Sequence, residues 1–287
     1  MADKDIDEAT GVSTTGHEWD GIRELNNPMP RWWLWTFYAC IAWALVYSIA
    51  YPAWPMLTTT TKGWLGYSSR AEVRNELAAA DLLKGDYRQA IAAEPLSEII
   101  ADEKLRTFAV AAGAAAFKVN CIQCHGTGAQ GSAGFPNLND DDWLWGGKVE
   151  DIHISVLHGI RFAADPDTRV SEMPKFSEIL KPGEISQAAA YVVSLTDPKA
   201  DAAAAAAGKE IFAQNCAACH GEDAKGNREF GAPNLADAVS LYGSAPEQIV
   251  AQISAAKHGA MPAWGARLGE TVVKELAVYV HSLGGGE

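Results

Sequence analysis

The sequence predicts an all-α protein with one N-terminal transmembrane helix followed by two tandem copies of a small helical domain. Three observations support this fold class. The stretch from Trp32 to Thr61 contains no charged residue, alanine is abundant while β-branched runs are few, and the pattern Cys-x-x-Cys-His occurs twice, at residues 121–125 and 216–220. An uncharged apolar run of this length is typical of a membrane span, and alanine favours helix.

Residues 1–30 precede the apolar run and are polar and mostly acidic. Such a composition offers little apolar surface to bury, so it seldom forms a packed structure. We expect an extended, partly disordered cytoplasmic tail.

Residues 31–57 form the predicted transmembrane helix. About twenty apolar residues from Trp32 to Tyr51 would cross about 30 Å of hydrocarbon. Aromatic residues crowd both ends of the run, as they do at membrane interfaces, and Pro52 would end the helix. A cleaved signal peptide is the alternative, but the preceding region is acidic and the run is longer than a signal peptide's usual apolar region.

Residues 58–104 are interpreted as a spacer between the membrane and the repeated domains. Ser69 to Glu72 has the pattern of a capping box and predicts a helix to about Leu83. We expect Gly85 and Pro95 to interrupt the region, and a second helix to run from about Leu96 into the first cysteine motif. A docking surface for a partner subunit is an equally open interpretation of this segment.

Cys-x-x-Cys-His is the attachment signature of a c-type haem. The two thiols add to the two vinyl groups of the porphyrin, and the histidine donates its imidazole to the iron. The motifs therefore predict two covalently bound haem c groups, attached at Cys121, Cys124, Cys216 and Cys219 with His125 and His220 as proximal ligands. A redox Cys-x-x-Cys or half of a zinc site is less well supported, because neither a βαβ context nor further ligand pairs accompany the motifs.

The motifs belong to an internal repeat that divides the chain into residues 105–197 and residues 201–287. Both copies have a helix, the haem motif, a loop, a Met-Pro pair and a closing helix, which is the pattern of class I cytochromes c. The equivalent positions are Gly113 and Gly208, Phe117 and Phe212, Pro136 and Pro233, Met173 and Met261, and Tyr191 and Tyr279.

Met173 and Met261 are the predicted distal iron ligands, because each begins the Met-Pro pair of its copy. A thioether favours Fe(II), so His/Met ligation raises the reduction potential and suits electron transfer. Core packing is the ordinary role of methionine, and His158 and His258 are the rival ligands, less regularly spaced from Met-Pro. Whether each methionine serves its own copy or the other one stays open. His153 and His281 are expected at the surface or in helix packing.

The net charge of −13 argues against a nucleic-acid partner, because no basic face is available for phosphates. Four of the five cysteines lie in the haem motifs, so no disulfide is expected. Bacteria attach haem c outside the cytoplasmic membrane. The chain is therefore expected to span the inner membrane once, with its haem domains in the periplasm, although lysine and arginine counts on the two sides of the span are indecisive.

The stretch from Thr15 to Trp33, with Glu18-Trp19-Asp20-Gly21-Ile22 at its centre, resembles the entry to the dihaem subunit III (FixP/CcoP-like) of cbb3-type cytochrome c oxidase. The likeness covers essentially the whole chain. It implies a bacterial respiratory complex with a catalytic haem–copper subunit and a monohaem cytochrome c subunit as partners. It also suggests that the carbonyls of Pro136 and Pro233 accept the hydrogen bonds of the proximal histidines.

The function implied by this resemblance is electron relay from a soluble periplasmic cytochrome c, through the monohaem subunit, to the oxygen-reducing centre. The chain would be a non-catalytic subunit of a proton-translocating oxidase, with no catalytic residue of its own. The alternatives are a free-standing membrane-bound dihaem carrier, a cytochrome subunit of another dehydrogenase complex and a dihaem peroxidase. Two Met-Pro pairs argue against the peroxidase, which needs an accessible distal site.

Overall fold

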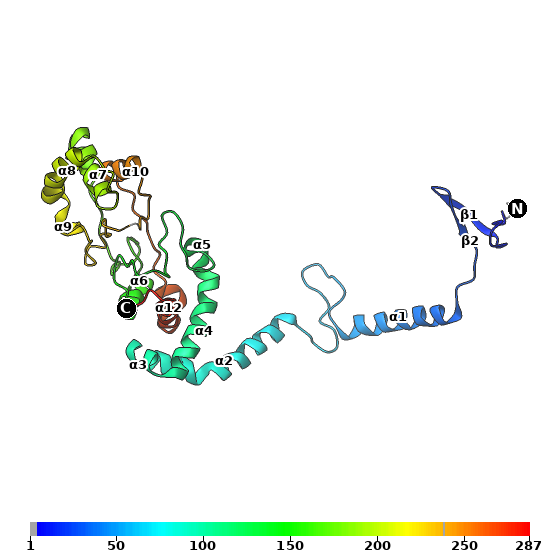
Figure 1. Cartoon of the computed structure of the whole chain (residues 1–287). Helices are drawn as coiled ribbons and strands as arrows, with labels where there is room; N and C mark the ends of the chain where they lie inside the picture. The colour runs from blue at the N-terminus through cyan, green and yellow to red at the C-terminus, as the bar shows by residue number, and fades with distance from the viewer. Residues whose placement is uncertain (1–4, 238) are drawn as a thin grey trace. The chain divides into compact units, whose positions relative to one another are not determined.

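The computed structural model describes residues 5–237 and 239–287. The chain divides into two compact units, the first ending at Leu83 and the second running from Lys84 to Glu287. Apart from one short hairpin, the regular elements of the described residues are helices, which confirms the predicted fold class (Figure 1).

The N-terminal tail forms a β-hairpin, so the expectation of an extended segment was wrong in this part. Strand β1 (Thr14–Trp19) pairs antiparallel with β2 (Ile22–Leu25), and Trp19 faces Ile22 across the turn. The turn residues Asp20 and Gly21 both have positive φ, at 51° and 84°. Asp-Gly favours the two-residue turn whose twist matches a hairpin, and this local signal outweighs the polar composition.

Helix α1 (Arg31–Ala50) is the one helix among the described residues that is long and apolar enough to cross a membrane. None of its residues is buried within the protein, which is the exposure expected of a single span surrounded by lipid. The ring of Trp33 stacks on Phe37 near one end, and Tyr47 stacks on Tyr51 at the other.

Helix α2 (Ser69–Ala93) begins where the sequence predicts, but it continues through Gly85. A single glycine costs a helix only about 1 kcal/mol, so Gly85 is tolerated. The predicted helix from Leu96 is divided into α3 (Leu96–Ala101) and α4 (Glu103–Asn120). Asp102 causes the division, because its carboxylate accepts hydrogen bonds from the backbone N–H groups of Lys104 and Leu105 and so starts a new helix.

The second unit contains the remaining helices, which come in equivalent sets from the two sequence copies. The first copy supplies α4, α5 (Ile122–His125), α6 (Val149–His158), the 3-10 helix η1 (Phe176–Glu178) and α7 (Pro182–Ser194). The second supplies α8 (Ala202–Asn215), α9 (Ala217–His220), α10 (Pro246–Ser254), α11 (Gly265–Leu268) and α12 (Glu270–His281).

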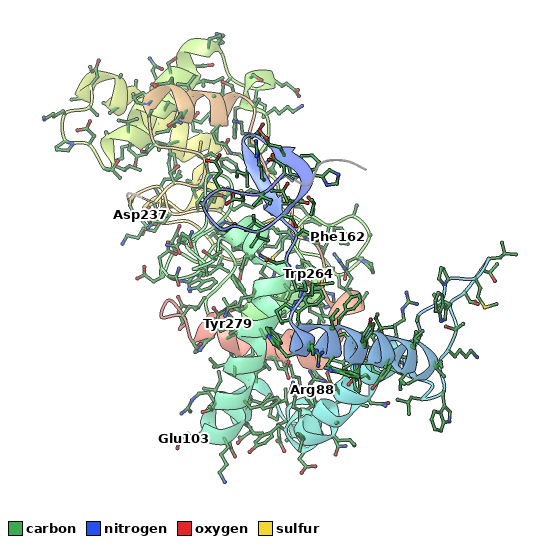
Figure 2. All side chains as sticks on the ribbon, turned by 90° about the vertical axis from the view of Figure 1, so that its right-hand side faces the viewer. Arg88, Glu103, Phe162, Asp237, Trp264 and Tyr279 are labelled. Atoms are coloured by element: carbon green, nitrogen blue, oxygen red, sulfur yellow. The ribbon has the colours of Figure 1, made fainter. Side chains whose placement is uncertain are left out.

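The closing helices pack against the opening helices of the other copy. Helix α12 lies against α4 and α6, whereas α7 lies against α8 and α10 (Figure 1). The aromatic pairs repeat this exchange, because Phe117 contacts Tyr279 at 5.4 Å and Phe212 contacts Tyr191 at 5.1 Å between ring centroids. Tyr279 projects from α12 close to the end of α4 (Figure 2).

Each helix pair has its own apolar core. One core includes Phe117 of α4 and Val273 and Leu276 of α12, and it extends to Ile91 and Ile99 of α2 and α3. The core of the other helix set includes Phe176, Ile185 and Ile253. A small second cluster contains Phe212 and Cys216. Two haem-motif units therefore exist within the second part of the chain, and each combines elements of both sequence copies.

Candidate functional site

The first haem motif lies at the end of α4, where one tight helical turn, α5, carries it. The backbone N–H groups of Cys124 and His125 both donate to the carbonyl of Cys121, at 3.1 and 2.9 Å. Cys121 is partly buried and Cys124 is exposed. The turn fixes the separation of the two thiols and places the imidazole directly after them, as a covalently attached porphyrin requires.

The second motif has the same geometry at the end of α8. The N–H groups of Cys219 and His220 donate to the carbonyl of Cys216, again at 3.1 and 2.9 Å. Cys216 is buried and Cys219 is exposed. The two sites are thus close structural copies.

Each proximal histidine is oriented by a proline carbonyl, as the family resemblance suggested. Nδ1 of His125 lies 3.1 Å from the carbonyl oxygen of Pro136, and Nδ1 of His220 lies 3.1 Å from that of Pro233. A carbonyl can only accept, so Nδ1 carries the proton and Nε2 is left with its lone pair for a metal. Burial lowers the pKa of both imidazoles, and the carbonyl bond offsets this only in part, which favours the neutral, ligating form.

The thiols of Cys121 and Cys216 are held in their protonated form. Burial, reinforced by the neighbouring thiol of the same motif, raises the pKa of Cys121 and of Cys216 to about 11. All five cysteines are present as free thiols in the structure.

Met173 lies in the cavity of the second motif. This cavity has a volume of about 500 Å³, and its walls include Met173 together with Cys216, Cys219 and His220. The backbone N–H of Met173 donates to Nε2 of His258 at 2.9 Å. His258 thus contacts the Met-Pro segment through its ring nitrogen.

Met261 lies in the core of the first motif. It packs in the same apolar cluster as Phe117, Cys121 and Trp264. Its backbone is fixed by reciprocal hydrogen bonds with Ile160, each 2.9 Å long. The structure therefore brings each methionine to the haem motif of the other copy, a pairing that the sequence left open.

The remaining histidines have other partners. Nδ1 of His158 lies 3.2 Å from Oδ1 of Asp165, and Nε2 of His281 lies 3.0 Å from the carbonyl oxygen of Glu287. His153 is mostly buried and its Nε2 lies 3.0 Å from a carboxylate oxygen of Glu270.

The donor set at each motif fits a covalently bound haem. Two thiols one turn apart, a neutral imidazole with its free nitrogen available and a thioether are the groups that hold haem c. The cavity at the second motif adds apolar walls, among them Phe176, Phe212 and Leu235.

The two sites share a wall. The loop after the first motif contributes Phe135 and Pro136 to the cavity that His220 faces. Pro136 is also the residue whose carbonyl orients His125. One residue thus touches the proximal ligand of one site and the cavity of the other.

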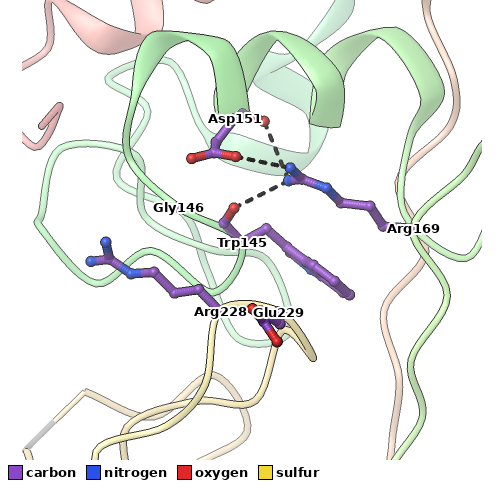
Figure 3. A pocket seen from close by; sticks show the side chains of 6 residues that line it. All are labelled: Trp145, Gly146, Asp151, Arg169, Arg228 and Glu229. Carbon is purple, nitrogen blue, oxygen red and sulfur yellow. Dashed lines mark hydrogen bonds and ion pairs between the residues drawn. The ribbon is translucent and has the colours of Figure 1, made fainter.

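The loops also interlock through equivalent aromatic residues, Trp145 in the first copy and Tyr242 in the second. The ring of Trp145 lies so close to Gly231 that a side chain there would collide with it, and Tyr242 approaches Gly134. Trp145 lies in a smaller cavity of about 420 Å³, beside Arg169 (Figure 3). Arg169 donates to the Trp145 carbonyl at 3.2 Å and pairs with Asp151 at 3.1 Å.

Arg161 is a cavity residue that the sequence-based reasoning missed. It lines the cavity of the second motif, although it belongs to the first copy. The available signal was the segment from Ile160 to Glu172, which has no counterpart in the second copy, where Ala260 alone separates His258-Gly259 from Met261.

Comparison with known families gives three successive matches along the chain. Residues 11–58 match the N-terminal domain of cytochrome oxidase-cbb3, FixP, and residues 110–196 match cytochrome c. Residues 203–280 match cytochrome c oxidase, cbb3-type, subunit III.

Known proteins resemble the chain over its full length. It is 61% identical to the cbb3-type cytochrome c oxidase subunit FixP of Sinorhizobium medicae and 62% identical to that of Rhizobium meliloti, with 100% of both chains covered in each comparison. It is 52% identical to the subunit CcoP of Cereibacter sphaeroides, over 96% of this chain and 95% of the relative.

Proposed function

The chain belongs to the family of FixP and CcoP subunits of cbb3-type cytochrome c oxidases, and on this ground we propose that it relays electrons from a periplasmic cytochrome c to the monohaem subunit of its oxidase. Members of this family are membrane-anchored dihaem cytochromes c, so the chain carries two covalently bound haem c groups. When bound, each haem supplies a one-electron iron couple. The protein's own residues attach it, orient it and set its potential.

The proposed axial ligands are crossed between the two sequence copies. His125 and Met261 would hold the haem attached at Cys121 and Cys124, and His220 and Met173 the haem attached at Cys216 and Cys219. The observation that carries this proposal is the position of Met173 in the same cavity as His220, while Met261 packs with Cys121. With both axial positions taken, neither site would bind oxygen, so the chain's role is electron transfer.

The shared wall supports a relay within the chain. Pro136 contacts the proximal histidine of one site and lines the cavity of the other, so the two haem groups would be close neighbours. An electron entering at one site would then reach the other without leaving the protein.

The proposed topology places the tail in the cytoplasm and both haem sites in the periplasm, because bacteria attach haem c on that side. Residues 58–104 would act as the spacer, and the sequence-based domains 105–197 and 201–287 would be interleaved in the folded protein. Protease treatment of spheroplasts tests the orientation: the haem-bearing part should be degraded while the hairpin of the tail is protected.

The function is tested by gentle detergent extraction of the tagged chain, followed by metal analysis and oxygen uptake. Copper and b-type haem that co-purify with oxygen reduction driven by reduced cytochrome c would support the proposal. Two c haems without copper or oxygen uptake would instead indicate a free-standing dihaem carrier.

A further inference from the structure

Arg161 occupies an unusual backbone position on a segment that only the first copy has. Its φ is 52°, in the left-handed region that side-chain-bearing residues seldom adopt. Its N–H donates to the carbonyl of Arg169 at 2.8 Å, and the preceding Ile160 pairs with Met261. The surrounding structure therefore holds Arg161 in a conformation that costs free energy, and backbone positions of this kind cluster at functional sites.

The guanidinium group of Arg161 points into the wall of the second-motif cavity. Nε donates to the carbonyl of Gly259 at 2.7 Å, and Nη1 donates to the carbonyl of Ser171 at 2.9 Å. Gly259 lies two residues before Met261, and Ser171 lies two residues before Met173. These bonds fix the planar group and leave Nη2 without a hydrogen-bond partner among the described residues.

Arg161 has no counter-ion within ion-pair distance in the part of the chain that the structure describes. Its side chain is half-buried, and burial lowers the pKa of the guanidinium more than Tyr242 and Glu172 raise it. Arg169, by contrast, is paired with Asp151. A desolvated cation without an anion is costly, so an anionic group that enters the cavity would be stabilised there.

We propose that Arg161 of the first sequence copy binds a propionate of the haem that is attached to the second copy, at Cys216 and Cys219. A guanidinium with two nitrogens already fixed presents its remaining N–H groups to a carboxylate with little further loss of entropy. This inference rests on the proposed haem site of His220 and Met173. The haem would bring the carboxylate that Arg161 lacks, and the first copy would contribute both a ligand and a counter-charge to the second site.

Other charged groups around the cavity make the Arg161 side the favourable place for a propionate. Asp142, Asp237 and Asp140 form an acidic region, and burial together with these neighbouring carboxylates raises the pKa of Asp142 to about 6. A propionate would be repelled from that wall. Apart from the haem-motif residues Cys216, Cys219 and His220, the remaining titratable groups on the cavity walls are Glu172, Lys257, His258 and Tyr242. Lys257 is the rival cation, but it is exposed.

Redox titration of the intact oxidase complex tests the proposal. Arg161→Gln should lower the midpoint potential of one c haem, because a cation near the haem favours its reduced state. The expected change is on the order of tenfold in the ratio of reduced to oxidised haem, which corresponds to about 59 mV for one electron. The ratio of reduced to oxidised haem at the first motif should change by less than about threefold.

The affected haem is identified by a second substitution. Cys219→Ser leaves one vinyl group unsaturated and moves the α-band of the second-motif haem to longer wavelength, and Cys124→Ser does the same for the first-motif haem. The midpoint potential that Arg161→Gln lowers should be that of the haem whose α-band is shifted by Cys219→Ser. If the Cys219→Ser variant does not mature, the lowered midpoint potential should be that of the haem whose α-band Cys124→Ser leaves unchanged.

Two substitutions that remove the same charge serve as controls. Lys257 is exposed on the wall of the same cavity, and Arg228 pairs with Glu287 at 2.6 Å. Lys257→Gln and Arg228→Gln should leave the second-motif potential within about threefold, because these charges are screened by solvent or by a partner. A shift in Lys257→Gln as large as in Arg161→Gln would overturn the assignment.

Arg161→Lys separates charge from backbone support. Because lysine keeps the charge, the midpoint potential of the second-motif haem should stay near that of the unsubstituted protein. Lysine cannot donate to both Gly259 and Ser171 while reaching the cavity, so the resonance Raman bending band of the propionate should move. This variant also carries the test if Arg161→Gln does not assemble. An unchanged propionate band, or an unchanged second-motif potential in Arg161→Gln, would contradict the proposal. Loss of the sulfur-to-iron charge-transfer band is a different result, because it would count against Met173 as ligand.

Discussion

Glu275 is a buried acidic side chain on α12, only 1% exposed, and its Oε1 has no hydrogen-bond partner among the described residues. Burial raises its pKa above the ordinary value of 4.5, and Arg88 and Lys84 offset this only in part. The folded state thus holds the proton more tightly than the unfolded state does. Stability should therefore fall as the pH rises from about 4.5 through the raised native pKa.

Glu275→Gln keeps the shape of the side chain and removes its titration. Thermal melts between pH 4 and pH 8 should show that the variant gains stability relative to the parent protein as the pH rises, with little difference at the acid end. A constant difference across this range would mean that Glu275 does not titrate in the folded state.

The residues of the haem sites could be predicted from sequence to very different degrees. Cys121, His125 and their counterparts follow from a motif that covalent attachment requires, and Pro136 follows from the family resemblance. Arg161 could not be found in this way, because its position depends on contacts with Gly259, a residue far away in sequence. The role of Arg161 at the haem site can be inferred only once the fold shows that its guanidinium group has no counter-ion among the described residues.

At the scale of helices, Lys274 joins α12 to the end of α2. Its Nζ donates to the carbonyls of Ile91, Ala92 and Glu94, at 3.2, 3.1 and 2.8 Å. These carbonyls lie at or beyond the last turn of α2, where no intrahelical partner remains. The lysine thereby caps the C-terminal end of α2.

Lys274→Met should loosen this end of α2, because hydrogen bonds from a charged donor each contribute about 1.5–3 kcal/mol. Hydrogen–deuterium exchange should increase over residues 84–101 and stay unchanged in α8. Lys209→Met, on the exposed face of α8, is the matched control and should alter neither region. Equal protection in the two variants would show that the cap contributes nothing.

Two equivalent glycines allow the helix pairs to approach closely. A Cβ atom at Gly113 would lie 2.6 Å from Cβ of Tyr279, and one at Gly208 would lie 2.9 Å from Cβ of Tyr191. Backbone carbonyls of Glu275 and Gln187 block the same positions. The glycines of α4 and α8 are therefore required by the packing of α12 and α7.

Gly113→Ala and Gly208→Ala should each destabilise the protein by about 1–3 kcal/mol, the usual cost of overpacking. Gly85→Ala is the control, because nothing lies within 4 Å of its added Cβ and alanine should stabilise the helix by up to about 1 kcal/mol. Denaturant unfolding measures all three. Stabilisation by Gly113→Ala would contradict the close contact between α4 and α12.

Elements were predictable where local signals agree and not where they compete. Helix α2 begins at Ser69 as predicted, where Oγ of the preceding Ser68 accepts a hydrogen bond from the N–H of Ala71, and α1 ends shortly before Pro52. The hairpin was missed because the acidic composition of the tail received more weight than its Asp20-Gly21 turn. Asp102 likewise ends one helix and caps the next within a stretch whose overall pattern is helical.

At the scale of the whole molecule, the sequence defines two copies but not how their parts combine. Tyr191 of α7 and Tyr279 of α12 occupy equivalent positions, so either closing helix has the apolar pattern needed for either core. The short connection between α7 and α8 favours packing of these neighbours on one another, and α12 then closes the first-motif core. The length of the connection between α7 and α8 and the packing of the helices decide which closing helix completes which core, and the sequence repeat alone does not determine this.

The measurement that tests the crossed arrangement most directly is carbon monoxide binding to Met173→Leu and Met261→Leu. Leucine cannot ligate iron, so each substitution should leave one c haem open to the gas and lower its potential. Each variant is combined with Cys219→Ser, whose displaced α-band marks the second-motif haem. The structure predicts that Met173→Leu allows binding at the marked haem and Met261→Leu at the unmarked one. Binding at the unmarked haem in Met173→Leu would show instead that each methionine serves its own sequence copy.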